Sequence, residues 1–77
     1  MDSRNNVEST GEIIETWVKL YINSLYRWAL IKTSEKEKAE DLVQDTFLAA
    51  YQQLENFNGK SSPKTWLLAI LNNKIKG

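Results

Sequence analysis

Apolar residues recur at spacings of three and four in three stretches of this sequence, and no stretch shows the strict alternation typical of a strand. This spacing places the apolar side chains of each stretch on one face of an α-helix. The three apolar stripes comprise Ile14, Trp17, Val18, Tyr21, Leu25, Trp28 and Ala29; Ala39, Leu42, Val43, Thr46, Phe47, Ala50 and Leu54; and Trp66, Leu67, Ile70 and Leu71. Because 77 residues make one small domain, the sequence predicts an all-α fold, a compact three-helix bundle with a short loop before the third helix.

Capping signals mark where each predicted helix begins or ends. Ser9–Glu12 and Ser34–Glu37 each have the spacing of a capping box, in which a serine and a glutamate satisfy free backbone N–H groups. Asn58-Gly59 is typical of a helix end followed by a turn, because glycine tolerates a positive φ. Ser62-Pro63 is typical of an N-cap followed by proline at the first helical position, so the third helix should begin there.

The first residues are polar and lack the apolar segment of a signal peptide. We expect residues 1–9 to form a disordered tail and residues 10–77 to form the helical domain. No apolar run approaches the roughly 18 residues of a membrane span. The plain expectation is a soluble cytoplasmic protein.

The sequence contains neither cysteine nor histidine. This composition excludes disulfides, thiolate or imidazole metal sites, and catalysis by a Cys–His or Ser–His pair. Glu37, Glu40, Asp41 and Asp45 could be considered as a carboxylate metal site, since Glu37 and Asp41, and Asp41 and Asp45, lie one turn apart. No second carboxylate-bearing helix faces them, however. We therefore expect no enzyme activity, no metal site and no cofactor.

The charge is zero overall and is unevenly spread. Residues 34–57 carry six acidic side chains and two lysines, a net charge of −4, whereas residues 58–77 carry four lysines and no acid, a net charge of +4. This division indicates either two different partners or a domain whose two halves neutralise each other.

The face of the second helix opposite its apolar stripe combines apolar and acidic groups. A leucine and a tyrosine stand there among short acids and amides, which is typical of an interface with an apolar centre and a polar rim. Scattered surface leucines are also common, so a solvated face is the alternative. The predicted docking face consists of Asp41, Gln44, Asp45, Leu48, Tyr51 and Gln52.

The loop and the third helix have the composition of a nucleic-acid surface. An aromatic ring, spare backbone N–H groups and lysines suit a phosphate and an unstacked base, while Asn and Thr can read base edges. An ordinary turn followed by a solvated, lysine-bearing helix is the alternative. The predicted DNA-binding residues are Phe57, Asn58, Gly59, Lys60, Ser61, Ser62, Lys64, Thr65, Asn72, Asn73 and Lys76.

Two segments together, AEDLVQDTF at residues 39–47 and FNGKSSPKTWL at residues 57–67, resemble region 2 of bacterial sigma factors of the extracytoplasmic-function (ECF) group. The resemblance implies that the second helix docks on the β′ coiled coil of RNA polymerase. It implies that the loop and third helix recognise the minus-ten promoter element on the non-template strand, with a flipped base held by Phe57 and residues 58–61. Asn73 matches a family asparagine near the upstream end of that element.

The sequence departs from the family pattern at several points. Leu68-Ala69 replaces the usual Tyr-Arg, so the arginine side chain expected to bind a phosphate is missing. Asn58 stands where arginine is common. Because the sequence ends at Gly77, we expect the linker and region 4 of a sigma factor to be absent from it. An anti-sigma factor is a further partner that the resemblance allows. A helical module that binds only protein and a helix-turn-helix duplex binder remain as alternatives.

Overall fold

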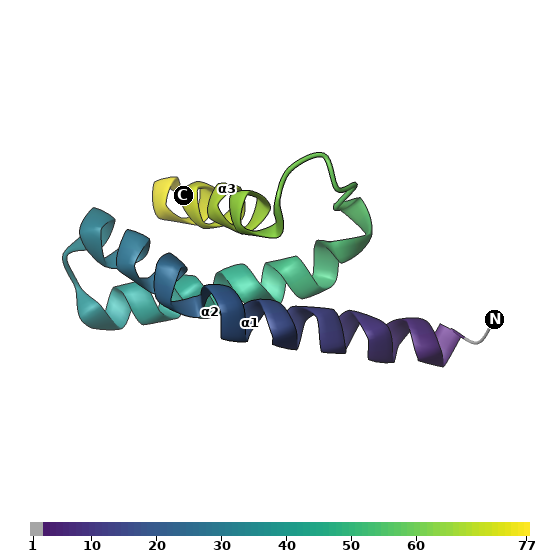
Figure 1. Cartoon of the computed structure of the whole chain (residues 1–77). Helices are drawn as coiled ribbons and strands as arrows, with labels where there is room; N and C mark the ends of the chain where they lie inside the picture. The colour runs from purple at the N-terminus through teal and green to yellow at the C-terminus, as the bar shows by residue number, and fades with distance from the viewer. Residues whose placement is uncertain (1–2) are drawn as a thin grey trace.

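The computed structural model describes the backbone of residues 3–77 and the side chains of residues 9–77. The chain forms helices α1 (Ser3–Thr33), α2 (Lys36–Gln53) and α3 (Pro63–Lys76), with a short 3-10 helix, η1 (Leu54–Asn56), after α2. No strand occurs within residues 3–77. Helices α1 and α2 run antiparallel, and α3 packs against both of them (Figure 1). The predicted all-α, three-helix fold is confirmed.

Helix α1 begins earlier than the capping box at Ser9–Glu12 predicted. It starts at Ser3, so residues 3–9 are helical where the sequence predicted a disordered tail, and Met1 and Asp2 lie outside the described residues. No proline precedes Ser9 to stop the helix, and a glycine inside a helix costs only about 1 kcal/mol. A capping signature therefore marks a possible helix start without ending the helix before it.

The turn between α1 and α2 is also built differently from the prediction. Ser34 adopts a left-handed conformation with φ of 60°, and its N–H donates to the carbonyl of Leu30 at 2.7 Å, so it ends α1 and does not cap α2. The N-cap of α2 is Glu35, which makes no side-chain cap. Instead the Thr33 hydroxyl oxygen accepts from the N–H of Glu35 at 3.3 Å. The predicted capping box at Ser34–Glu37 is therefore wrong.

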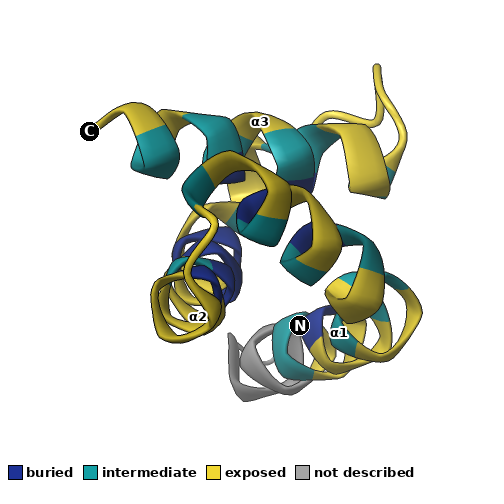
Figure 2. Ribbon diagram, turned by 90° about the vertical axis from the view of Figure 1, so that its left-hand side faces the viewer, coloured by how far each residue is buried: buried dark blue, intermediate teal, exposed yellow. Residues whose placement is uncertain are grey.

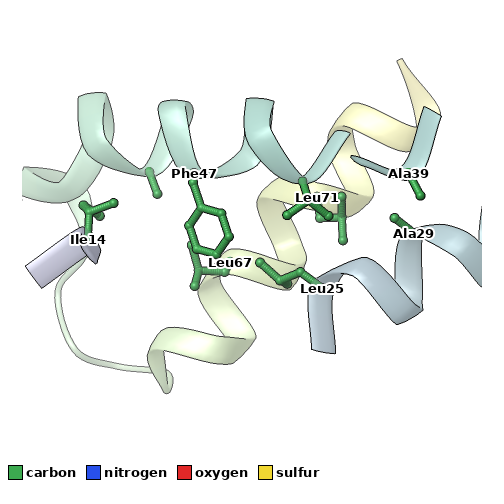
Figure 3. Close-up of a cluster of buried hydrophobic side chains, with 9 residues drawn as sticks. Ile14, Leu25, Ala29, Ala39, Phe47, Leu67 and Leu71 are labelled. Carbon is green, nitrogen blue, oxygen red and sulfur yellow. The ribbon is translucent and has the colours of Figure 1, made fainter. Parts of the chain in front are cut away.

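The core lies where the three helices face one another, and buried residues line only the inward sides of the ribbons (Figure 2). Ala29 of α1 and Ala39 of α2 are both fully buried and face each other near the turn (Figure 3). Two alanines at this point allow close approach of the helices. Farther along, Phe47 points from α2 toward Leu67 of α3, while Leu25 lies beside Leu67 (Figure 3). Apolar burial of this kind supplies most of the stability of so small a domain.

The three tryptophans of the predicted core are less buried than their stripes indicated. Trp17 and Trp66 are half-buried at the edge of the core, and Trp28 is 37% exposed. Conversely, Ala49 is buried although it lies outside the predicted stripe. The periodicity of a helix gives its inward direction, but the width of the buried face depends on where the neighbouring helices end.

Candidate functional site

The predicted docking face of α2 is open to solvent over its whole length. Leu48 is 62% exposed and Tyr51 is 43% exposed, and Asp41, Gln44, Asp45 and Gln52 are exposed with them. Most of this leucine side chain therefore lies outside the core of its own domain. The face thus exposes apolar area beside the carboxylates of Asp41 and Asp45 and the amides of Gln44 and Gln52.

Two hollows follow the seam between α1 and α2 and extend this face onto α1. One, of about 540 Å³, is lined by Asp41 and Gln44 of α2 together with Ile22, Asn23 and Tyr26 of α1. The other, of about 410 Å³, is mostly apolar and is lined by Gln44, Leu48 and Tyr51 together with Ile14, Val18 and Ile22. Asp45 and Gln52 line neither hollow. The two hollows share Ile22, Val43 and Gln44, so the docking face continues into a groove formed by two helices.

The loop between η1 and α3 is held by its own hydrogen bonds. The Asn58 side-chain oxygen accepts from the Lys60 N–H at 3.0 Å, and Gly59 has φ of 78°, as the predicted turn requires. Asn58, Gly59, Lys60 and Ser61 are all exposed. Because the oxygen of Asn58 is used within the turn, its NH₂ group is the part of that side chain directed to other partners.

The aromatic ring at the start of the loop belongs to a cluster of three rings. Phe57 is half-buried and lies 5.4 Å from Trp17 in an edge-to-face arrangement and 5.2 Å from Trp66, measured between ring centroids. Trp17 and Trp66 lie 6.1 Å apart. These separations fall in the favourable range for aromatic pairs. Phe57 therefore anchors the loop to α1 and α3 and offers only part of its ring to a ligand.

The start of α3 is capped as the sequence predicted. The Ser62 hydroxyl oxygen accepts from the Thr65 N–H at 3.2 Å, Ser62 also bonds the Thr65 hydroxyl at 3.0 Å, and Pro63 occupies the first turn. This cap fixes the direction in which α3 leaves the loop. Both hydroxyl groups are exposed but already hydrogen-bonded, so their first role is structural.

The residues predicted on the outer face of α3 divide into two groups. Thr65, Asn73 and Lys76 are exposed, whereas Asn72 is half-buried against α1, and its side-chain oxygen accepts from Trp28 Nε1 at 2.7 Å. The side-chain oxygen of Asn72 is thus already used by α1, and its proposed role in DNA binding stays a prediction. Sequence reasoning also missed that Ile22 and Trp28 of α1 border the candidate surfaces. Their exposure at 39% and 37% results from helix packing, and no local pattern signals it.

Two features are absent from the described part of the chain. It contains no group of three or more acidic side chains placed to hold a metal ion. None of its helices is long and apolar enough to cross a membrane.

Comparison with known proteins identifies the family. The sigma-70 region 2 model matches residues 15–76. The chain belongs to the sigma-70 region 2 family. The match covers the predicted docking face, the loop and α3, so all the candidate residues lie inside this sigma region 2 domain.

Similar proteins carry sigma-factor names. A probable RNA polymerase sigma factor of Haemophilus influenzae is 48% identical over 62% of this chain and 25% of its own length. The ECF sigma factor SigM of Bacillus subtilis is 37% identical over 78% of this chain and 36% of its own length. The sigma factor YlaC of the same organism is 39% identical over 74% of this chain and 33% of its own length. The chain thus spans a quarter to about a third of these relatives. No solved structure matches it significantly.

Proposed function

We propose that this sigma region 2 domain docks on RNA polymerase core through α2 and recognises the minus-ten promoter element on the non-template strand during transcription initiation. The domain acts by binding and carries out no catalysis of its own. Its proposed partners are the β′ coiled coil of the polymerase and single-stranded promoter DNA. An anti-sigma factor would compete for the same surfaces.

The observation that carries the docking proposal is the exposed apolar area of α2 beside its acids. Leu48 and Tyr51 border the apolar hollow, and Asp41 and Asp45 are exposed on the same helix face. A partner helix of opposite pattern, apolar and basic, would bury the hollow and pair with the carboxylates. Such a helix is what the polymerase coiled coil would have to present.

Charge reversal at Asp45 tests docking. Asp45 is exposed and lines neither hollow, so Asp45→Lys should leave the fold intact while replacing an attraction with a repulsion. We expect core affinity to fall by ~1–3 kcal/mol, the scale for a charge pair at an interface. Competition against a labelled wild-type chain for purified core polymerase measures this loss.

Glu12→Lys is the matched control, because Glu12 is an exposed acid on α1 that lines neither hollow. Equal affinities for wild type, Asp45→Lys and Glu12→Lys would remove this face of α2 from the interface. An equal loss in both variants would indicate a general charge effect and would also contradict the proposal.

The proposal for single-stranded recognition is supported by the shape of the DNA-binding candidates. The loop holds Asn58, Lys60 and Ser61 exposed around a fixed turn, next to the anchored ring of Phe57. A loop of this kind can enclose one extruded base, and a strand that is already open avoids the cost of extruding it. By contrast, α3 offers a major groove little beyond Ala69 and Asn73 at its exposed centre, which disfavours the helix-turn-helix alternative.

A further inference from the structure

A hollow of about 240 Å³ lies between α1 and α3, apart from the docking face and the loop. Its walls are Ser24, Arg27, Trp28 and Ile31 from α1 and Lys64 and Leu68 from α3. Two cations from different helices therefore border one hollow, and no acidic residue lines it. Of these two cations, the sequence predicted a DNA-binding role for Lys64 but not for Arg27, because no sequence pattern places Arg27 close to α3.

Neither cation has an acidic partner among the residues whose side chains the structure describes. Arg27 and Lys64 are exposed and form no ion pair with a described residue. By contrast, Lys19 of α1 forms an ion pair with Glu15, with 3.6 Å between Lys19 Nζ and Glu15 Oε1. Two like charges beside one hollow repel each other until an anion comes between them. The hollow is thus set up electrostatically for a negatively charged group.

Apart from Ser24 and the two cations, the lining of the hollow is apolar, and its tryptophan is held in place. Trp28 is fixed at its edge because Nε1 donates to Asn72, and the ammonium group of Lys32 lies 4.8 Å from the Trp28 ring centroid. This ring therefore acts as a wall, since its N–H and one of its faces already have partners. Lys32 adds a third positive charge nearby, so the field around the hollow favours an anion further.

The position of Lys64 decides which anion is expected. Lys64 stands in the first turn of α3, three residues after Ser61 at the end of the exposed loop. A nucleic-acid strand that is held by the loop and continues along α3 would pass this turn. We propose that Arg27 and Lys64 together bind one backbone phosphate of that strand, so that α1 contributes to DNA binding. This inference rests on the proposed function, because it assumes that the loop holds a single strand.

A phosphate-by-phosphate substitution tests the assignment. The full chain is bound to core polymerase, and its affinity is measured for a fluorescent single strand selected on the wild-type complex. Each phosphate of the strand is then replaced in turn by an uncharged methylphosphonate. We expect one linkage whose neutralisation weakens wild-type binding severalfold and has little effect on Arg27→Gln or Lys64→Gln, because the contact is already lost in those variants.

Salt dependence gives a second measure. Each phosphate contact adds about 0.7 to the slope of log affinity against log salt for a single strand. Between 50 and 200 mM salt, a fourfold change, wild-type affinity should therefore fall about 2.6-fold more than that of Arg27→Gln. Lys19→Gln is the control, since it removes the same charge from an exposed position of α1 outside the hollow and should retain the wild-type slope.

The possible outcomes distinguish failure of the phosphate site from failure of the proposed function. If the wild-type complex binds no single strand, the proposed function fails and this inference fails with it. If the wild type binds but Arg27→Gln and Lys19→Gln behave alike at every linkage, the phosphate site is overturned while the proposed function stands. If Arg27→Gln weakens core binding and leaves DNA binding unchanged, the hollow contacts an acidic protein segment, and the phosphate assignment is wrong.

Discussion

Phe57 connects the stability of the domain with the geometry of its loop, and its replacement by alanine tests both. The ring makes two aromatic pairs, with Trp17 at 5.4 Å and Trp66 at 5.2 Å. Each pair contributes about 0.5–1.5 kcal/mol beyond the area it buries. A fully buried phenylalanine costs about 3–5 kcal/mol when truncated to alanine. Since Phe57 is half-buried, we expect Phe57→Ala to lower the free energy of unfolding by about 2–4 kcal/mol.

Thermal unfolding followed by circular dichroism measures this effect. In a domain of this size each kcal/mol shifts the midpoint by about 4–8 °C, so the midpoint should fall by about 8 °C or more. Phe57→Leu is the matched control, because it retains an apolar side chain and loses only the aromatic geometry. We expect its loss to be smaller than that of Phe57→Ala and to lie within the roughly 1–3 kcal/mol that two aromatic pairs contribute. A midpoint for Phe57→Ala within 2 °C of the wild type, on the order of half a kcal/mol, would refute the anchoring role of the ring.

Three further predictions concern the local structure around the helices and the loop. Ser62→Ala removes the acceptor for the Thr65 N–H and should cost about 1 kcal/mol in urea unfolding; an unchanged midpoint would show that water replaces the cap. Gly59→Ala should cost about 1 kcal/mol, because φ is +78° although nothing lies within 4 Å of the added Cβ. Gly11→Ala should instead stabilise α1 by up to about 1 kcal/mol, since its Cβ would meet Tyr51 at an ordinary 4.0 Å; effects of equal sign would contradict this contrast. Thr46→Val should change stability by less than about 1 kcal/mol, because the Leu42 carbonyl that accepts from the Thr46 hydroxyl at 2.8 Å keeps its helical N–H partner. A larger loss on calorimetry would mean that the hydroxyl has another essential role.

Local sequence signals predicted the three helices correctly. They predicted the start of α3 correctly but not the starts of α1 and α2. Ser62-Pro63 predicted the start of α3 correctly because the cap is made by residues within one turn of each other. Ser34 was assigned to the wrong helix end, because a serine can cap a helix or take the left-handed conformation that ends one. Which of these it does depends on how α1 and α2 pack, and the sequence of the turn alone does not contain that information.

The candidate surfaces were predictable to the extent that one helix or one loop forms them. The exposure of Leu48 and Tyr51 followed from the helical period of α2, and the turn at Gly59 followed from residue type. The pairing of Asn72 with Trp28 and the approach of Lys64 to the hollow beside Arg27 join residues more than 35 positions apart in the chain. Such contacts depend on the crossing of α1 and α3, which periodicity within either helix does not specify.

The most direct test of the account is the form of DNA that the polymerase-bound domain prefers. A fluorescent strand carrying the minus-ten element is compared with the same sequence as an intact duplex, and each of the four bases is placed in turn at the flipped position. The account predicts tighter binding of the single strand, a preference for one base at that position, and a change of that preference when residues 58–61 are replaced by the loop of another sigma factor. Equal affinity for all four bases, or tighter binding of the closed duplex, would contradict recognition by the loop and favour a helix that reads the groove.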